Sequence, residues 1–261
     1  MDYGLTGKRA FVSGSTQGIG YAVARTCAAE GASVVLNGRD AHRVDRAVDR
    51  LRAELPDADV SGIAADFADG REVQALLDAL GRVDVLVNNV GLFGVEPFID
   101  TGDDTWRRYF EVNVMSGVRL SRRLLPAMLA AGWGRIVFVG TESAVDVPGD
   151  MVHYGATKAA VMALSNGLAK LTRGTGVTVN TVLGGPTYSE GVADTVERIA
   201  ALRGTSPDEL KAALVRDTSL LQRFIEPDEV AHLVAYLASP VSSATNGAAL
   251  RADGGVLTTL V

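Results

Sequence analysis

The chain has 261 residues, of which 47% are hydrophobic and 21% are charged, and this balance excludes a disordered chain. Its 25 basic and 31 acidic residues give a net charge of −6 without a long run of either sign, which excludes the concentrated basic face that nucleic-acid binding needs. One cysteine, Cys27, and three histidines rule out an internal disulfide and argue against a metal site.

No apolar stretch reaches the length of about 20 residues that a membrane span requires. The first residues, MDYGLTGKRAFVSG, lack the basic and then apolar regions of a secretory signal. We therefore expect a cytoplasmic protein that does not associate with membranes.

Short apolar, β-branched runs alternate with longer amphipathic stretches along the whole chain. The predicted strands are 9–13, 33–37, 60–65, 83–88, 135–139, 177–183 and about 248–251. Several of these runs are apolar throughout, which is typical of strands that helices cover on both faces. The alternation predicts one α/β domain over 1–261, with a doubly wound parallel sheet of about seven strands.

One segment, at about 184–226, breaks this rhythm. It begins with Gly184-Gly185-Pro186 directly after the sixth predicted strand, and it has room for two helices. Ligands bind beyond the carboxyl ends of the strands in open α/β sheets, so the segment is predicted to be a lid over a substrate pocket. An irregular surface insertion is the alternative.

The first predicted strand leads into a glycine-rich turn, Gly14-Ser15-Thr16-Gln17-Gly18-Ile19-Gly20, and then into a helix. Glycines here permit a tight turn and a close approach of the backbone to a pyrophosphate at the helix N-terminus. The turn therefore indicates a dinucleotide site, although a βα turn that binds nothing has the same local pattern. A methyltransferase that uses S-adenosylmethionine would need an acidic residue at position 37, where Asn37 stands.

The end of the second predicted strand bears on the choice of dinucleotide. Asn37 occupies the place of the acidic residue that would bind a ribose 2′-hydroxyl, and Arg39 can offer several donors to a 2′-phosphate. Asp40 suits the N-cap of the next helix. These residues favour NADP(H) over NAD(H), unless Arg39 is only a solvated surface arginine.

Tyr154 and Lys158 are four residues apart at the start of a predicted long helix, 152–173. Side chains at this spacing share one helix face. A neighbouring ammonium favours the phenolate and lowers the pKa of the phenol, so the tyrosine could act as an acid or base near neutral pH.

With these motifs in order, the chain resembles a classical short-chain dehydrogenase/reductase over essentially its whole length. The resemblance rests on the glycine-rich turn, Asn88-Asn89-Val90-Gly91, Tyr154 with Lys158, the run from Asn180 to Pro186, and Asp253-Gly254-Gly255. It implies a Rossmann-type fold and an oxidoreductase.

The resemblance also implies roles for individual residues. Tyr154 would be the acid/base, Lys158 would bind the nicotinamide ribose, and Asn113 would support a water in the proton relay. Thr141 stands where the family has serine, and Ser143 is the alternative. The cofactor would contact Gly14, Ser15, Thr16, Gln17, Gly18, Ile19, Gly20, Asn37, Arg39, Asp66, Phe67, Asn89, Val90, Gly91, Tyr154, Lys158, Gly185 and Thr187. The substrate would contact Thr141, Ser143, Tyr154 and Tyr188.

The reaction implied is hydride transfer between NADP(H) and a small-molecule carbonyl or secondary alcohol. The substrate stays open among 3-oxoacyl thioesters, sugars or polyols, and ketones. An NAD-dependent alcohol or sugar dehydrogenase is one alternative, and a non-catalytic dinucleotide-binding protein is another. The resemblance further implies a homotetramer or dimer, formed through the predicted long helices 104–131 and 152–173.

Overall fold

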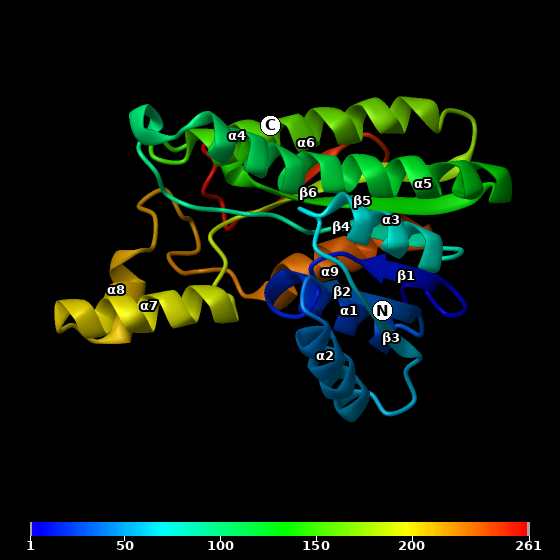
Figure 1. Cartoon of the computed structure of the whole chain (residues 1–261), viewed down its shortest axis with the longest axis horizontal. Coiled ribbons are helices and arrows are strands. Elements are labelled where there is room, and N and C mark those ends of the chain that lie inside the picture. Colours follow the sequence, from blue (N-terminus) through cyan, green and yellow to red (C-terminus); the bar gives the residue numbers. More distant parts are fainter. Residues whose placement is uncertain (1, 260–261) are drawn as a thin grey trace.

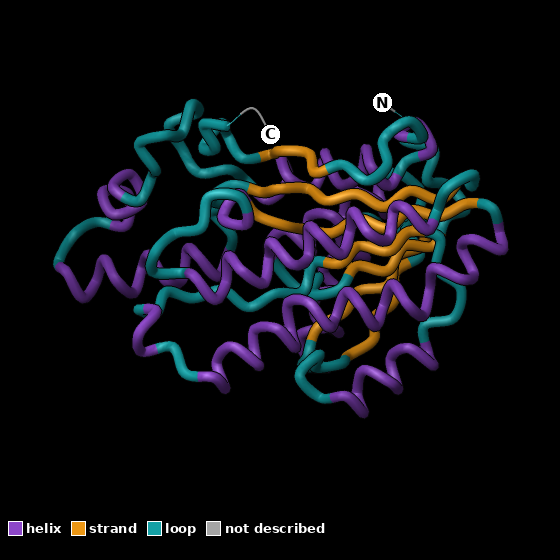
Figure 2. Tube along the Cα trace, turned by 90° about the horizontal axis from the view of Figure 1, so that it is seen from above, coloured by secondary structure: helices purple, strands orange, loops and turns teal. Residues whose placement is uncertain are grey.

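Seven parallel strands form one sheet in the computed structural model, which describes residues 2–259 apart from the side chains of Thr195, Ile199, Leu202 and Arg203 (Figures 1 and 2). The strands are β1 (Arg9–Val12), β2 (Ser33–Gly38), β3 (Val60–Ala64), β4 (Val85–Asn88), β5 (Trp133–Thr141), β6 (Gly176–Gly184) and β7 (Ala249–Ala252). Their order is β3-β2-β1-β4-β5-β6-β7. The predicted strands and the doubly wound parallel sheet are confirmed, with ends that differ by one or two residues.

Helices cover both faces of the sheet (Figure 1). The core on one face is made with α1 (Gly18–Ala29), α2 (Ala41–Glu54) and α9 (Pro227–Ala238). The core on the other face is made with α3 (Gly70–Ala79), α5 (Ser116–Ala131) and α6 (Val152–Leu171).

The central strand β1 shows why its sequence is apolar throughout. Ala10 and Val12 belong to the core that contains α1 and α9, whereas Phe11 between them belongs to the core on the opposite face. All three residues are fully buried. Successive side chains of a strand point to opposite faces, so a strand covered on both sides has no position left for a polar residue.

The predicted long helix 104–131 is interrupted. It consists of α4 (Asp103–Phe110), one π-helical turn (η2, Glu111–Met115) and α5. Such turns insert an extra residue into a helix and are frequent at functional sites. Asn113 lies in this turn, and its amide is bonded to Leu92 in the chain segment that follows β4.

The segment between β6 and α9, residues 185–226, contains the two helices for which the sequence has room, α7 (Glu190–Arg203) and α8 (Pro207–Ala213). They pack on each other through a small apolar cluster of Val196, Ala200 and Leu210, and they project beyond the sheet in Figure 1. The remaining short helices are η1 (Phe98–Asp100), η3 (Glu142–Ala144) and η4 (Pro240–Ser242).

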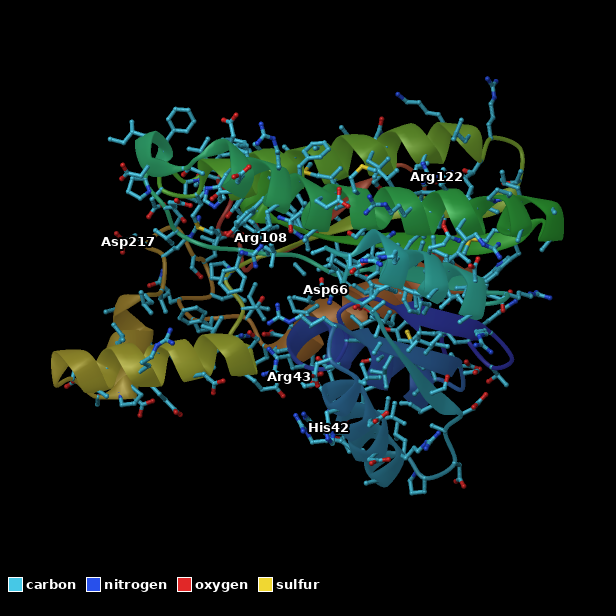
Figure 3. All side chains as sticks on the ribbon, in the orientation of Figure 1. His42, Arg43, Asp66, Arg108, Arg122 and Asp217 are labelled. Atoms are coloured by element: carbon cyan, nitrogen blue, oxygen red, sulfur yellow. The ribbon has the colours of Figure 1, made fainter. Side chains whose placement is uncertain are left out.

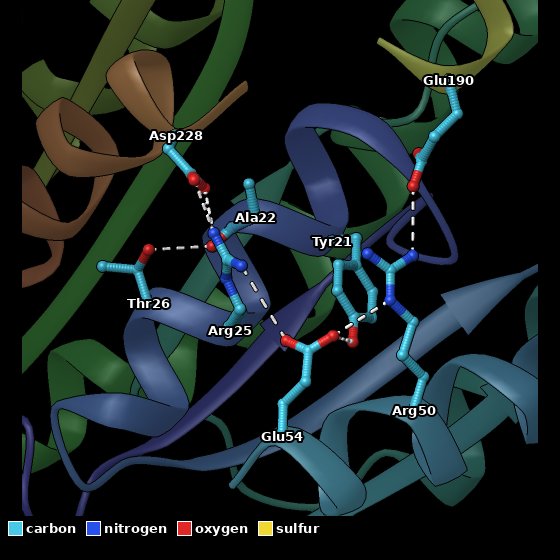
Figure 4. A network of polar contacts seen from close by, with 8 residues as sticks. All are labelled: Tyr21, Ala22, Arg25, Thr26, Arg50, Glu54, Glu190 and Asp228. Carbon is cyan, nitrogen blue, oxygen red and sulfur yellow. Dashed lines mark hydrogen bonds and ion pairs between the residues drawn. The ribbon is translucent and has the colours of Figure 1, made fainter. Parts of the chain in front are cut away.

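A polar network links helices that are far apart in the sequence (Figure 4). Arg25 of α1 binds Asp228 of α9 at 2.5 Å and lies 3.9 Å from Glu54 of α2. Arg50 of α2 binds Glu54 at 3.0 Å and Glu190 of α7 at 3.1 Å. The network therefore connects the 185–226 segment to the glycine-rich side of the domain.

Candidate functional site

A cavity of about 720 Å³ lies at the carboxyl ends of the strands, between the domain and the 185–226 segment. Its lining includes most of the residues that the sequence singles out. They are Gly14, Thr16, Gln17, Gly18, Ile19, Gly20, Asn37, Arg39, Asp66, Phe67, Asn89, Val90, Gly91, Thr141, Tyr154, Gly185 and Thr187. The strand order thus brings motifs from the whole chain to one place, as open parallel sheets do.

The glycine positions of the glycine-rich turn are unsuited to residues with side chains. A Cβ at Gly20 would lie 2.3 Å from the carbonyl oxygen of Gly14, and Gly14 and Gly18 have φ of +62° and +57°. Gly18 begins α1, and its N–H donates to a carboxylate oxygen of Glu190 at 2.7 Å. An anion thus already meets the helix N-terminus, where the positive end of the helix dipole favours negative charge.

Asn37 and Ser15 hold the shape of this turn. The Asn37 amide oxygen accepts the N–H of Gly14 at 3.1 Å, and its nitrogen donates to Ile63 O at 3.0 Å. The hydroxyl of Ser15 donates to Val12 O and accepts the N–H of Asn37. Both polar atoms of the Asn37 side chain are therefore engaged within the protein, so Asn37 fixes the turn to β3.

Two exposed arginines line the neighbouring end of the cavity. Arg39 follows β2, and Arg43 lies in the first turn of α2. Asp40 between them caps α2 by accepting the N–H of Arg43 at 2.8 Å, as its position predicts. Figure 3 shows Arg43 beside the opening, with Asp66 above it. Sequence reasoning missed Arg43, although the usable signal was a second arginine in the first turn of the helix that Asp40 was expected to cap.

The segment after β4 is bonded to the glycine-rich turn. The amide of Asn89 donates to Ser13 O and Gly14 O at 3.1 and 2.8 Å. The Ser13 hydroxyl accepts the N–H groups of Asn89 and Val90. The two segments thus form one continuous wall of the cavity.

Tyr154 and Lys158 lie one turn apart on α6, with the ammonium 6.0 Å from the centre of the phenol ring. Lys158 Nζ donates to Val139 O at 3.1 Å, and burial lowers the pKa of the ammonium to about 8. Burial also raises the pKa of Tyr154, and the charge of Glu142 raises it further, while a hydrogen bond with Thr141 opposes them. This direction is opposite to the lowering expected from the sequence, because burial outweighs every other influence on the phenol.

Gly91 lies against Lys158, and Asn113 joins the segments around it. A Cβ at Gly91 would lie 3.2 Å from Lys158 Nζ, so glycine allows the ammonium to approach the backbone. The Asn113 amide accepts the N–H of Leu92 at 2.6 Å and donates to Leu92 O and to the Thr157 hydroxyl. Asn113 thus joins the π-helical turn, the strand-end segment and α6.

Thr141 ends β5 and contacts a carboxylate that the sequence reasoning missed. Its hydroxyl donates to Glu142 Oε2 at 2.5 Å and accepts the N–H of Ser143 at 3.2 Å. Ser143 is buried and donates to Glu142 Oε1 at 3.1 Å, and it does not line the cavity. The sequence does contain a signal for Glu142, because this carboxylate stands between Thr141 and Ser143, the two hydroxyl residues predicted to contact the substrate.

The segment after β6 contributes Gly185 and Thr187. A Cβ at Gly185 would lie 2.6 Å from Asp253 O, and the Thr187 hydroxyl donates to Gly185 O at 2.9 Å. Tyr188, which the resemblance assigns to the substrate, does not line the cavity. Its ring packs against Phe224 and lies under Lys211, because the apolar ring helps to fill the core between α7 and α8.

Within residues 2–259, no group of three or more histidines, cysteines or acidic residues is arranged to hold a metal ion. No described helix is both long and apolar enough to cross a membrane.

Comparisons with known proteins give a consistent result. A family model described as enoyl-(acyl carrier protein) reductase matches residues 14–257. The uncharacterized oxidoreductase YvaG of Bacillus subtilis is 44% identical, with 98% of each chain covered. D-beta-hydroxybutyrate dehydrogenase of Cupriavidus necator is 31% identical over 96% of this chain and 98% of its own.

A solved structure is similar over the full length. L-Sorbose reductase of Gluconobacter frateurii, complexed with NADPH and L-sorbose, matches with a TM-score of 0.94 and 32% identity, with 100% of both chains covered. The similarity therefore extends over the sheet, its helices and the 185–226 segment.

Proposed function

Because this chain belongs to the classical short-chain dehydrogenase/reductase family, we propose that it is an NADP(H)-dependent enzyme that interconverts a carbonyl and a secondary alcohol. Two of its relatives are named for oxidation or reduction of such groups, D-beta-hydroxybutyrate dehydrogenase and L-sorbose reductase. The proposal adds the choice of cofactor and the residues that act.

The observation that carries the proposal is the grouping of Thr141, Tyr154 and Lys158 beside one cavity that continues to the glycine-rich turn. A substrate oxygen between the hydroxyls of Thr141 and Tyr154 would have two donors to stabilise developing charge, once the single proton of the Thr141 hydroxyl turns from Glu142 Oε2 to the substrate. The same cavity extends to Gly18 and Arg39.

The residues at the other end of the cavity fit a dinucleotide. The closely packed turn at Gly14 and Gly20 leaves room for a backbone-bound pyrophosphate, and the N-terminus of α1 favours its charge. Arg39 and Arg43 would bind a 2′-phosphate, which supports NADP(H) over NAD(H). The cofactor, when bound, supplies or accepts the hydride.

The chain's own residues would manage the proton. In reduction, Tyr154 donates its phenol proton to the substrate oxygen, and in oxidation the phenolate takes the proton back. Lys158 is held by Val139 O and offers a positive charge that favours the phenolate as it forms.

Two alternatives stay open. An NAD-dependent alcohol or sugar dehydrogenase would use the same hydroxyl groups with a different cofactor. A non-catalytic dinucleotide-binding protein would keep the glycine-rich turn and have no need of Tyr154 beside Lys158. Tighter binding of NADH than of NADPH would favour the first alternative. Dinucleotide binding without turnover of any substrate would favour the second.

The test begins with a fluorescence titration of the purified protein with NADPH and NADH, followed by assays with ketones and diketones. We expect NADPH to bind more tightly and to be oxidised in the presence of a ketone. In the Tyr154→Phe variant we expect turnover to fall about 10²- to 10⁴-fold while NADPH binding is retained, because only the proton donor is lost. Failure of both dinucleotides to bind would contradict the proposal.

The assembly and the location stay predictions. A homotetramer or dimer is supported by apolar residues that are exposed on the expected interface helices, Phe110 of α4 (49% exposed) and Leu171 of α6 (64% exposed). The substrate of the enzyme would be a small molecule, and the cytoplasm is the expected location of the protein.

A further inference from the structure

Glu142 is a buried carboxylate at the substrate end of the cavity. Its side chain is 4% exposed, and it lies between Thr141 and Ser143 directly after β5. Charged side chains are seldom buried so deeply without a function or a full set of partners. Neither the proton transfer by Tyr154 nor the dinucleotide site requires a carboxylate at this position.

The contacts of Glu142 leave capacity for one more donor. Its Oε1 accepts the Ser143 hydroxyl at 3.1 Å and pairs with Arg216 Nη2 at 3.0 Å. Its Oε2 accepts the Thr141 hydroxyl at 2.5 Å. Each carboxylate oxygen has two lone pairs. Within the described part of the chain, Oε1 therefore has two donors and Oε2 has one.

The remaining acceptor, Glu142 Oε2, lies close to the place where the reacting oxygen of a substrate would bind. The Thr141 hydroxyl has one proton, so a substrate oxygen that accepts it, at about 2.8 Å, takes that donor away from Glu142 Oε2. Oε2 lies 2.5 Å from the same hydroxyl oxygen. While Thr141 and Tyr154 hold the reacting oxygen, a hydroxyl on the carbon next to the reacting carbon would be within reach of Oε2 and would replace the donor that Oε2 loses.

The charge around Glu142 disfavours an anion at the same place. Its cationic partner, Arg216, comes from the 185–226 segment and is already engaged by the carboxylate. A substrate carboxylate next to the reacting carbon would lie beside Glu142, and repulsion between like charges in a buried site is costly. A neutral hydroxyl gains a hydrogen bond there and brings no charge.

We propose that Glu142, with Arg216, determines specificity: it selects neutral substrates that carry a hydroxyl next to the reacting carbonyl, as hydroxy ketones and ketose sugars do, and rejects 2-oxo acids. This inference rests on the proposed function. Glu142 would contact the substrate, and Arg216 of the 185–226 segment would hold the Glu142 carboxylate in place.

The test uses three ketones of nearly equal size as substrates with NADPH: hydroxyacetone, acetone and pyruvate. They differ only in the group beside the carbonyl, which is a hydroxymethyl, a methyl or a carboxylate. For the unmodified protein we expect kcat/KM to be about 10-fold or more higher for hydroxyacetone than for acetone, and lowest for pyruvate, because a hydrogen bond to a charged group is worth that much. This ranking is measured on the unmodified protein, so it does not depend on whether a variant folds.

The Glu142→Gln variant removes the charge at nearly the same volume. We expect the preference for hydroxyacetone over acetone to shrink to a few-fold and the discrimination against pyruvate to weaken. General damage to the site would lower all three rates together, so the ratios isolate the effect. Asp217→Asn is the matched control, because it removes one negative charge from an exposed residue (Figure 3) that follows Arg216 in the chain, and we expect it to keep the original ranking.

Three outcomes would overturn the inference. A preference of the unmodified protein for pyruvate would mean that Arg216 binds an anionic substrate. An unchanged ranking in Glu142→Gln would remove Glu142 from substrate selection. No turnover of hydroxyacetone by protein that binds NADPH would show that this pocket does not accept such a hydroxyl. The proposed function is contradicted separately, by the failure of dinucleotide binding.

Discussion

Glu142 and Lys158 show how single charged groups are accommodated beside the cavity. Glu142 is compensated by two hydroxyls and by Arg216. Lys158 has one backbone carbonyl as its acceptor, and burial lowers its pKa to about 8. Lysine with this pKa still carries most of its charge at neutral pH and loses it above pH 8, so the support that it gives the Tyr154 phenolate weakens in alkaline solution.

The arginines at the cofactor end provide a test at the scale of single residues. We expect Arg39→Ala and Arg43→Ala each to weaken NADPH binding by about 10-fold or more and to leave NADH binding nearly unchanged, because each removes a charge-assisted bond to the 2′-phosphate. Fluorescence titration measures both affinities. Arg46→Ala is the control, since Arg46 is an exposed arginine of α2 that does not line the cavity. Equal losses for the two dinucleotides would exclude Arg39 and Arg43 as phosphate-binding residues.

Among helices, the contact between α7 and α1 has the clearest consequence. The first residue of α7, Glu190, directs one carboxylate oxygen to Gly18 N and the other to Arg50 (Figure 4). The N-terminus of α1 is also where a pyrophosphate would bind. The position of α7 and the binding of a dinucleotide are therefore coupled through one backbone N–H.

We expect Glu190→Gln to bind NADPH more tightly, by up to about 10-fold, because it removes a negative charge that competes with the pyrophosphate for the N-terminus of α1. The measurement is the dissociation constant of NADPH at low ionic strength. Glu197→Gln, an exposed position of the same helix, is the control and should behave as the unmodified protein. Weaker binding would mean instead that Glu190 holds α7 in the position that the cofactor requires.

For the whole molecule, the ion pair where the 185–226 segment rejoins the domain contributes to stability. Arg223 binds Glu229 of α9 through two hydrogen bonds of 2.7 and 2.8 Å. This bond is the main cause that lowers the pKa of Glu229 from 4.5 to about 2. A carboxyl whose pKa is lower in the folded state adds stability above its unfolded pKa, and that contribution disappears as the pH falls through the folded value.

The Glu229→Gln variant should therefore be less stable at pH 7, with a thermal midpoint about 2 °C lower, and the difference should disappear between pH 4.5 and 2. Thermal unfolding followed by circular dichroism at a series of pH values measures this. The control is Asp45→Asn, an exposed carboxylate of α2. A difference that is constant with pH would assign the loss to packing or capping at the start of α9.

The sequence by itself determined the succession of strands and helices along the chain, the glycine-rich turn and the pairing of Tyr154 with Lys158. Each of these depends on residues close together in the chain, through side-chain period, turn geometry or helical spacing. The roles of Thr141 and Asn113 stay predictions, although the structure brings both residues close to this pair.

Only the tertiary structure decided the features that depend on residues far apart in the sequence. Burial, which no local pattern measures, reversed the expected direction of the Tyr154 pKa. Packing between α7 and α8 took Tyr188 away from the cavity. The pairing of Glu142 with Arg216 joins positions 74 residues apart, and it exists only because the fold returns the 185–226 segment to the end of β5. Long-range contacts of this kind are set by the packing of the whole domain, and no spacing within the chain encodes them.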